Sequence, residues 1–345
     1  MAAPFTEVEV PDEPPLPTGM SSAEIRGRSP WYLAWVRLRR NKTALAFGLL
    51  FVVIVLACLA APLWADHVAH TTPDANHITD TISVDGASVD VVSPDGTPIG
   101  PGLRGQYLLG ADQNGRDVMV RLLYGGRTSI FIGVAAAAIT TVVAVVVGLL
   151  CGFYRGWIDA VLSRVMDVVW AFPVLLLGIA LGTALAVGGL SLGFVTLAGD
   201  SVWIPILIIG MVYVPYMARP IRGEILALRE KEFVEAAVAQ GKGPLRIMVT
   251  ELLPNVVSTI IVFFTLNIAN DMLLESALSF LGAGVRPPGA SWGTMIADGY
   301  QTIYTAPHLT IIPGLMIVLT VLSLNVFGDG LRDALDPRAK IRLEH

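Results

Sequence analysis

Charged residues are scarce in this sequence, and hydrophobic residues are unusually common. Asp, Glu, Lys and Arg make up 15% of the 345 residues, hydrophobic residues make up 54%, and the mean hydropathy is +0.66. Soluble domains contain about 25% charged residues. The composition therefore argues against a soluble globular protein and favours a membrane protein. The net charge of −5 carries little information, because the two signs are concentrated in different segments.

Several kinds of chemical site are also missing. Cys58 and Cys151 are the only cysteines, and they lie in separate apolar runs, which favours packing residues over a disulfide framework or a metal site. His67, His70 and His77 match no tight ligand spacing, so we expect solvated side chains rather than a metal. The sequence has no Gly-x-x-x-x-Gly-Lys-Ser/Thr phosphate loop, and we expect no cofactor in this chain.

The first 30 residues lack the apolar stretch of a cleaved secretory signal. They are rich in Pro, Glu and Ser, and we predict that they form a disordered N-terminus. Residues 31–42 combine aromatic side chains with cations, which favours a short helix on the inner leaflet of a membrane. The last residues, 343–345, resemble the start of a purification tag and are expected to take no part in the fold.

Long uncharged runs are abundant. About 20 apolar residues cross the hydrocarbon core of a bilayer as a helix. Six runs approach or exceed this length, which predicts an all-α, polytopic membrane protein with six transmembrane helices. The six runs cover residues 43–65, 128–154, 168–199, 201–218, 252–270 and 309–328.

The positions of Lys and Arg predict the orientation of these helices. If the N-terminus lies inside, most of the 23 Lys and Arg residues fall in inner segments. The positive-inside rule then places both termini and the loop between the fourth and fifth spans in the cytoplasm. The predicted segments are a cytoplasmic N-terminus (1–30), an interfacial helix and first span (31–65), an outer region (66–127), a membrane core (128–328) and a cytoplasmic C-terminus (329–342).

The outer region begins with a polar insert, residues 66–105. Asp-Gly pairs at 85–86 and 95–96 separate Val-rich pieces, and this pattern predicts one or two small β-hairpins. Residues 66–127 contain eight Asp and four Arg. We therefore predict that this negative region docks on a basic patch of an outer partner, with an affinity that falls as salt is added.

The longest charged loop between two apolar runs contains the pattern Glu-Ala-Ala-x-x-x-Gly, from Glu235 to Gly241. Periodicity over residues 225–240 predicts a short amphipathic helix that ends at Gly241. Pro244 would begin a second short helix that reaches Leu253-Pro254. Two such helices would form a blunt knob for a partner protein, and the alternative is an ordinary solvated loop. The apolar face of the first helix would consist of Leu226, Phe233, Val234 and Ala237.

Two long segments resemble one family of membrane proteins. The sequences ALSFLGAGVRPPGASWGTMIADG (277–299) and LNVFGDGLRDALDPR (324–338) are similar to the last outer loop and the C-terminus of one such family. This family is the C-type permease subunit of dipeptide, oligopeptide and nickel ABC importers. Shorter segments before the second span and at the start of the third also resemble it, so the resemblance covers about residues 110–340 and leaves the outer insert outside.

The Glu-Ala-Ala-x-x-x-Gly spacing is similar to the EAA loop of ABC-importer permeases in general. The resemblance implies a type I ABC importer permease fold in which the loop 219–254 contacts an ATPase. One residue departs from the general pattern, because Glu251 stands where an Ile would precede Leu-Pro. The resemblance assigns ATPase coupling to Phe233, Glu235, Ala236, Ala237, Gly241, Leu253 and Pro254.

The resemblance also implies a transport subunit rather than an enzyme, forming half of a translocation pathway for di- or oligopeptides. The implied partners are a homologous B-type permease, two ABC ATPase subunits that bind ATP and Mg, an extracytoplasmic substrate-binding protein and membrane lipid, without nucleic acid. Import of nickel, haem or another small solute is the alternative. An intramembrane aspartyl protease is disfavoured, because Asp329 and Asp271 fall on opposite sides of the membrane.

Two groups of charged residues border the predicted membrane core. Asp112, Arg116 and Asp117 would dock the binding protein or, equally, cap and pair along a surface helix. Asp271 and Glu275 fall at the predicted outer end of the fifth span, where charges are expensive and often functional. They would line the outer gate or touch the amino group of a peptide. The alternative, which we favour, is that both lie in the interface, paired or hydrated.

Overall fold

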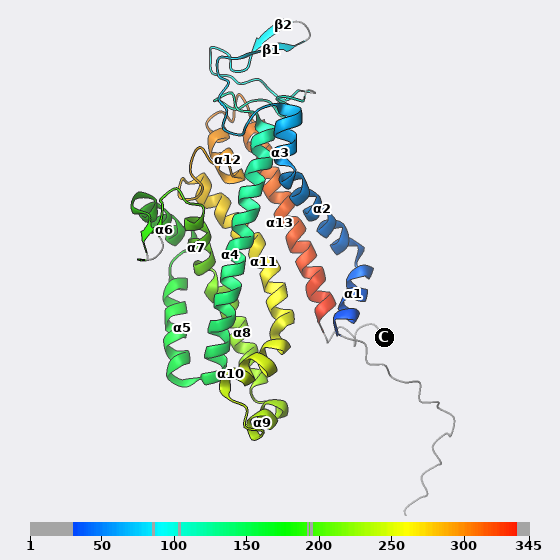
Figure 1. The fold of residues 1–345 in the computed structure, drawn as a ribbon, viewed down its shortest axis with the longest axis vertical. Coiled ribbons are helices and arrows are strands. Elements are labelled where there is room, and N and C mark those ends of the chain that lie inside the picture. Colours follow the sequence, from blue (N-terminus) through cyan, green and yellow to red (C-terminus); the bar gives the residue numbers. More distant parts are fainter. Residues whose placement is uncertain (1–29, 85–86, 103–104, 192, 194–195, 337–345) are drawn as a thin grey trace, which may run out of the picture.

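The computed structural model describes residues 30–336, apart from 85–86, 103–104, 192 and 194–195. It consists of long helices that run roughly along one axis, with a small β-hairpin at one end (Figure 1). Five helical runs are long and apolar enough to cross a membrane, or six if one bent pair of helices counts as a span. The prediction of a helical, polytopic membrane protein is confirmed, whereas the number of six spans depends on that pair.

Two helices lie where the sequence predicts an interfacial helix and a first span. α1 (Pro30–Arg40) and α2 (Lys42–Leu59) meet at Asn41, which caps α2 by accepting the N–H of Ala44 at 3.0 Å. A short helix, α3 (Ala61–Trp64), and a π-helical turn, η1 (Ala65–Ala69), continue this run.

The predicted hairpin is present in the outer insert. β1 (Thr81–Val84) and β2 (Ala87–Asp90) pair antiparallel, although the Asp-Gly turn between them lies outside the described residues. A second turn forms at Gly96, which has a φ of +82°. The insert is not separate from the bundle, because Arg121 donates to the carbonyl oxygen of Pro73 at 3.1 Å.

α4 (Val118–Tyr154) runs through the middle of the bundle and packs on α8 (Val214–Leu228). The two helices approach closely at glycines of α4. A Cβ atom at Gly148 would lie 2.6 Å from a side-chain atom of Ile221, and one at Gly152 would lie equally close to Ile225. Small residues such as these glycines allow close helix contacts in membranes.

The predicted third span, residues 168–199, is wrong as a continuous helix. α5 (Gly156–Ala171) and α6 (Val174–Gly188) meet at an angle of 88°. The cause is Pro173, which disfavours helical geometry in the residue before it. Phe172 accordingly has an extended backbone, with φ −85° and ψ 139°. Two short strands follow, β3 (Leu190–Ser191) and β4 (Thr196–Leu197).

The remaining helices complete the bundle. α7 (Trp203–Val212) leads into α8, and α9 (Glu232–Ala239) and α10 (Pro244–Ile247) connect α8 to α11 (Leu253–Phe280) through a π-helical turn, η2 (Met248–Leu252). α12 (Trp292–Tyr300) precedes α13 (His308–Leu335). In Figure 1, α9 lies at the end opposite to β1 and β2, and α1 lies toward the α9 end. We call these two ends the α9 end and the hairpin end.

Candidate functional site

The α9 end carries a projection formed by residues 229–247, which we call the α9 knob (Figure 1). Lys231 has an extended backbone, with φ −91° and ψ 147°, so that α8 stops before α9 begins. The predicted continuous helix over 225–240 is therefore wrong, because the chain leaves helical geometry at Lys231 between α8 and α9. Arg155 donates to Glu230 at 2.7 Å. This hydrogen bond holds the pKa of Glu230 below its usual range.

α9 is amphipathic, but its buried face is narrower than predicted. Val234 and Ala237 are buried and pack in a cluster that includes Ile247. Phe233 was expected on this face, yet it is 38% exposed. Glu235 and Ala236 are exposed.

Gly241 ends α9 as predicted. Its φ is +76°, a value that glycine adopts without steric cost. The N–H of Gly241 donates to the carbonyl oxygen of Val238 at 2.9 Å, and the N–H of Lys242 donates to that of Ala237 at 3.1 Å. These two bonds form a Schellman motif, which fixes the direction in which the chain leaves the helix.

The predicted second short helix begins at Pro244, as α10, but it is continuous with η2 and α11 rather than separate from them. Pro244 begins a helical run that continues to Phe280, with Pro254 inside its course. Glu251, the departure from the family pattern, pairs with Lys242 at 2.6 Å. This ion pair ties the turn after α9 to the base of α11, in a position where an Ile would instead contribute apolar packing.

The surface of the α9 knob exposes large apolar side chains among its charged ones. Large exposed apolar patches on a protein surface mark sites of protein–protein contact. Beside the exposed carboxylate of Glu235, the knob and the turn after it expose Phe233, Val238, Leu245 and Val249.

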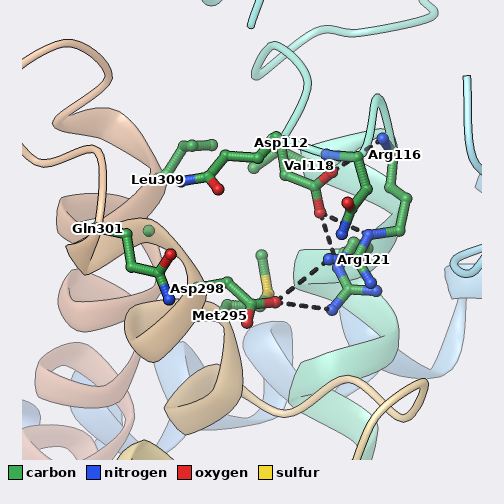
Figure 2. A pocket seen from close by; sticks show the side chains of 11 residues that line it. Asp112, Arg116, Val118, Arg121, Met295, Asp298, Gln301 and Leu309 are labelled. Atoms are coloured by element: carbon green, nitrogen blue, oxygen red, sulfur yellow. Dashed lines mark hydrogen bonds and ion pairs between the residues drawn. The ribbon is translucent and has the colours of Figure 1, made fainter. Parts of the chain in front are cut away.

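At the hairpin end, a charged cluster surrounds a cavity of about 230 Å³. Arg116 Nε lies 2.6 Å from a carboxylate oxygen of Asp112, and Arg116 Nη2 lies 3.2 Å from Asp298. Arg121 lies 3.5 Å from Asp112 and 3.6 Å from Asp298, and it donates to the carbonyl oxygen of Pro73 at 3.1 Å. Figure 2 shows both guanidinium groups directed toward these carboxylates. Arg121 thus joins the outer insert, α4 and α12.

Asp117 has a different task. Its two carboxylate oxygens accept the N–H of Val120 at 3.0 Å and the N–H of Tyr107 at 2.7 Å. Burial raises the pKa of Asp117, and these N–H donors oppose the rise. The predicted alternative of capping and pairing is observed, because Asp117 caps α4 and Asp112 pairs with Arg116. The surface location is wrong, because all three are buried. Their role in docking a receptor stays a prediction.

α11 carries a buried polar stripe formed by Asn267, Asp271 and Glu275, spaced four residues apart. None of the three is exposed, so the expectation that Asp271 and Glu275 are hydrated is wrong, and only the paired alternative is left. Glu275 accepts from Ser279 Oγ at 2.7 Å. Among the residues that the structure describes, neither carboxylate oxygen of Asp271 has a hydrogen-bond partner.

The serines around Glu275 organise the loop between α11 and α12. Ser279 Oγ also accepts the N–H of Val285 at 3.0 Å, and Ser129 Oγ accepts the N–H of Trp292 at 3.1 Å. Ser291 caps α12 through a reciprocal pair of bonds with Thr294. Glu275 therefore supports the loop that follows α11, whereas the carboxylate of Asp271 makes no hydrogen bond within the part of the chain that the structure describes.

Two segments of the sequence match models of known protein families. The model of the binding-protein-dependent transport system inner membrane component matches residues 144–341. The model of the N-terminal TM domain of oligopeptide transport permease C matches residues 29–80. The chain belongs to the first of these families. The resemblance seen in the sequence is thereby confirmed, and the chain is a permease subunit of a transport system.

Curated relatives cover almost the whole permease. The dipeptide transport system permease protein DppC of Alkalihalophilus pseudofirmus is 34% identical over 90% of this chain and 91% of its own length. The glutathione transport system permease protein GsiD is 34% identical over 91% of this chain in both Pectobacterium atrosepticum and an Escherichia coli strain, with 93% and 92% of those proteins covered.

The fold is similar to that of a solved transporter. The methionine ABC transporter MetNI, in an inward-facing conformation, matches with a TM-score of 0.52 and 18% identity. The match covers 63% of this permease and 97% of the MetNI chain. It shows that the two bundles share a fold.

Sequence reasoning missed several residues that the structure brings together. Asp298 joins Arg116 although 182 positions separate them, and no local pattern marks that contact. The sequence could have indicated Asn267 as part of the polar stripe, because it precedes Asp271 by about one helical turn.

Proposed function

We propose that this permease forms half of the translocation pathway of an ATP-driven importer of short peptides. The observation that carries the proposal is the α9 knob, which projects with exposed apolar side chains from a chain related over its length to a dipeptide permease. A knob of this kind suits a subunit that performs no chemistry itself and receives motion from a partner.

The proposed coupling runs from α9 into the bundle. Phe233, Glu235 and Ala236 face outward to contact an ATPase subunit, which binds ATP and Mg. Val234 and Ala237 anchor α9 on the base of α11 through the cluster that includes Ile247 and Leu252. Movement of the ATPases would therefore be transmitted to a helix that reaches the other end of the bundle, giving alternating access.

The proposed orientation follows from this coupling. The α9 end, with α1 and the end of α13, lies in the cytoplasm, and the hairpin end lies outside. A homologous B-type permease completes the pathway, a second ATPase serves that subunit, and a substrate-binding protein docks at the hairpin end. Asp271 and Glu275 belong to the gate region of the pathway. The exposed Trp31 and Trp35 of α1, beside Arg39, suit contact with the inner lipid leaflet.

The cargo that the relatives support is a short peptide. One relative is named for dipeptides and another for glutathione, which is a tripeptide. Both names agree on a small molecule that carries amide groups together with ammonium and carboxylate groups. Import of nickel, haem or another small solute through the same architecture is the competing function.

Uptake into vesicles tests the proposal. The permease is reconstituted in vesicles with its partner permease, both ATPases and the binding protein. ATP is enclosed on the side of the membrane that holds the ATPases, and labelled trialanine is added on the opposite side. We expect ATP-dependent accumulation that disappears when this subunit is omitted. Accumulation of nickel or haem but not of any di- or tripeptide under the same conditions would overturn the peptide assignment.

A further inference from the structure

A second cavity, of about 440 Å³, opens at the α9 end between α8, α11 and α13. Its size falls within the range of about 300–1,000 Å³ that is typical of small-molecule sites. The last residue of α11 that lines it is Leu266, and the next residues, from Asn267 to Ala269, are buried. On α11, the lining of the cavity therefore ends at Leu266.

The wall of this cavity combines hydrogen-bonding and aromatic groups. Asn255, Ser258 and Thr259 of α11 present an amide and two hydroxyls. Tyr216 and Phe263 add aromatic rings whose centroids lie 5.7 Å apart. Tyr216 also stacks on Trp170, at 6.3 Å and an interplanar angle of 16°. The aromatic part of the wall is thus held in place from a third helix.

The rim of the cavity carries charges of both signs on different helices. Glu224 comes from α8 and Arg332 from α13. Within the described residues, no ion pair engages either side chain. The carbonyl oxygens at the end of α13 are instead taken by Arg37, which donates to Asp336 at 2.8 Å and to Ala334 at 3.4 Å. Arg332 is therefore not needed to cap its own helix.

We propose that this cavity is a binding vestibule for a short zwitterionic peptide. Arg332 takes the C-terminal carboxylate, because a guanidinium matches a carboxylate in both charge and geometry. Glu224 takes the N-terminal ammonium from the opposite side. The amide and hydroxyl groups of α11 bind the peptide bonds, and the rings of Tyr216 and Phe263 contact a side chain. This site rests on the proposed function and names where the cargo binds within this subunit.

Protection of an introduced cysteine tests whether peptide occupies the vestibule. Ser258→Cys places a thiol in the wall, and the native Cys58 and Cys151 are both buried and free. The complete complex in inside-out vesicles is treated with a charged methanethiosulfonate reagent, with and without trialanine. We expect trialanine to slow labelling at position 258 severalfold. Thr250→Cys is the matched control, because Thr250 is exposed at the same end but does not line the cavity, and its labelling should not change.

The charged ends of the peptide are tested separately. Arg332→Gln should weaken protection by trialanine about tenfold or more, yet leave protection by trialanine amide unchanged, since that peptide lacks the carboxylate. Glu224→Gln should weaken protection by trialanine and leave that by N-acetyl-trialanine unchanged. Arg246→Gln, at an exposed cation of the same end, is the control that should have no effect.

Two results overturn the vestibule. One is unslowed labelling of Ser258→Cys at trialanine concentrations that saturate uptake. The other is equal protection by N-acetyl-trialanine amide, which carries neither charge. Peptide uptake by the complex without substitutions is measured in parallel. Intact uptake without protection removes the vestibule and leaves the proposed function, whereas absence of uptake of any peptide removes both.

Discussion

Buried charges at the hairpin end contrast with exposed charges at the α9 end. Asp112, Arg116 and Arg121 are at most 8% exposed and pair with one another around a small cavity. At the α9 end, Glu235 is exposed beside Phe233 and Val238, which are 38% and 58% exposed. Buried charges that pair with one another hold the elements that carry them in fixed positions. Exposed apolar side chains, in contrast, are stabilised when a partner protein covers them and removes them from water. The comparison indicates that ion pairs within the chain fix the hairpin end, whereas the α9 end exposes a surface that a partner protein could cover.

The most severe test of this contrast is a charge reversal on the α9 knob. We expect Glu235→Lys to abolish ATP-dependent uptake while the subunit still folds and inserts, because the side chain is exposed and makes no hydrogen bond or ion pair with any described residue. Gly241→Asp should act similarly by straining the turn at a φ of +76°. Uptake and a pull-down of the ATPases are the measurements.

Glu232→Lys is the matched control, since it changes the same charge on the same exposed helix outside the motif. It should retain most of the uptake. If the Glu235→Lys complex still binds the ATPases and couples hydrolysis to uptake, the coupling role of α9 is wrong.

Much of the fold follows from the sequence, because the hydrophobic runs are long and the membrane leaves few alternatives to a helix. The hairpin, the end of α9 at Gly241 and the close packing of α4 follow from local chemistry. Local chemistry also explains the break at Phe172, which the apolar composition of residues 168–199 conceals.

Burial was harder to predict from the sequence. Asp271 and Glu275 were expected in the interface, paired or hydrated, and both are buried. The contact from Asp298 to Arg116 depends on tertiary packing that no sequence spacing reveals.

Removing the guanidinium of Arg121 should lower the stability of the hairpin end. Arg121→Met leaves Asp112 and Asp298 with one guanidinium instead of two and releases the carbonyl oxygen of Pro73. Breaking a buried ion pair costs about 3–5 kcal/mol, so we expect a clear fall in the midpoint of thermal unfolding. Arg127→Met is the control, because Arg127 is exposed and lies over the ring of Tyr124 at 5.5 Å.

For Arg127→Met we expect a loss of about 0.5–1 kcal/mol. Equal shifts in the two variants would mean that the cluster around Arg121 does not fasten the hairpin end.

Two substitutions on α11, Glu275→Gln and Asp271→Asn, compare a carboxylate that accepts a hydrogen bond with one that accepts none among the described residues. Glu275→Gln weakens the bonds from Ser279 and should cost about 1–3 kcal/mol of stability. Asp271→Asn removes no hydrogen bond among the described residues and should leave stability nearly unchanged. If Asp271 acts in the gate, its variant should lose uptake at unchanged stability. A stable Asp271→Asn variant with full uptake would remove Asp271 from the pathway.

The smallest effect is expected from the tip of the outer insert. Replacing residues 81–90 with a short Gly/Ser turn removes β1 and β2 but keeps the Pro73 contact that joins the insert to the bundle. Assembly with the ATPases should be preserved, and binding of the substrate-binding protein should weaken modestly and lose part of its salt dependence. Unchanged receptor affinity across a salt series would leave the hairpin without a docking role.

Crosslinking from α9 tests the central claim most directly. Ala236→Cys places an exposed thiol on the knob, and a short bifunctional reagent is added to the assembled complex in its membrane. We predict one dominant product that joins this permease to an ATPase subunit. The same substitution at Ala87, in the hairpin, should give no such product. Crosslinks from position 236 only to lipid, to the binding protein or to nothing would contradict the assignment of α9 as the contact through which ATP hydrolysis drives transport.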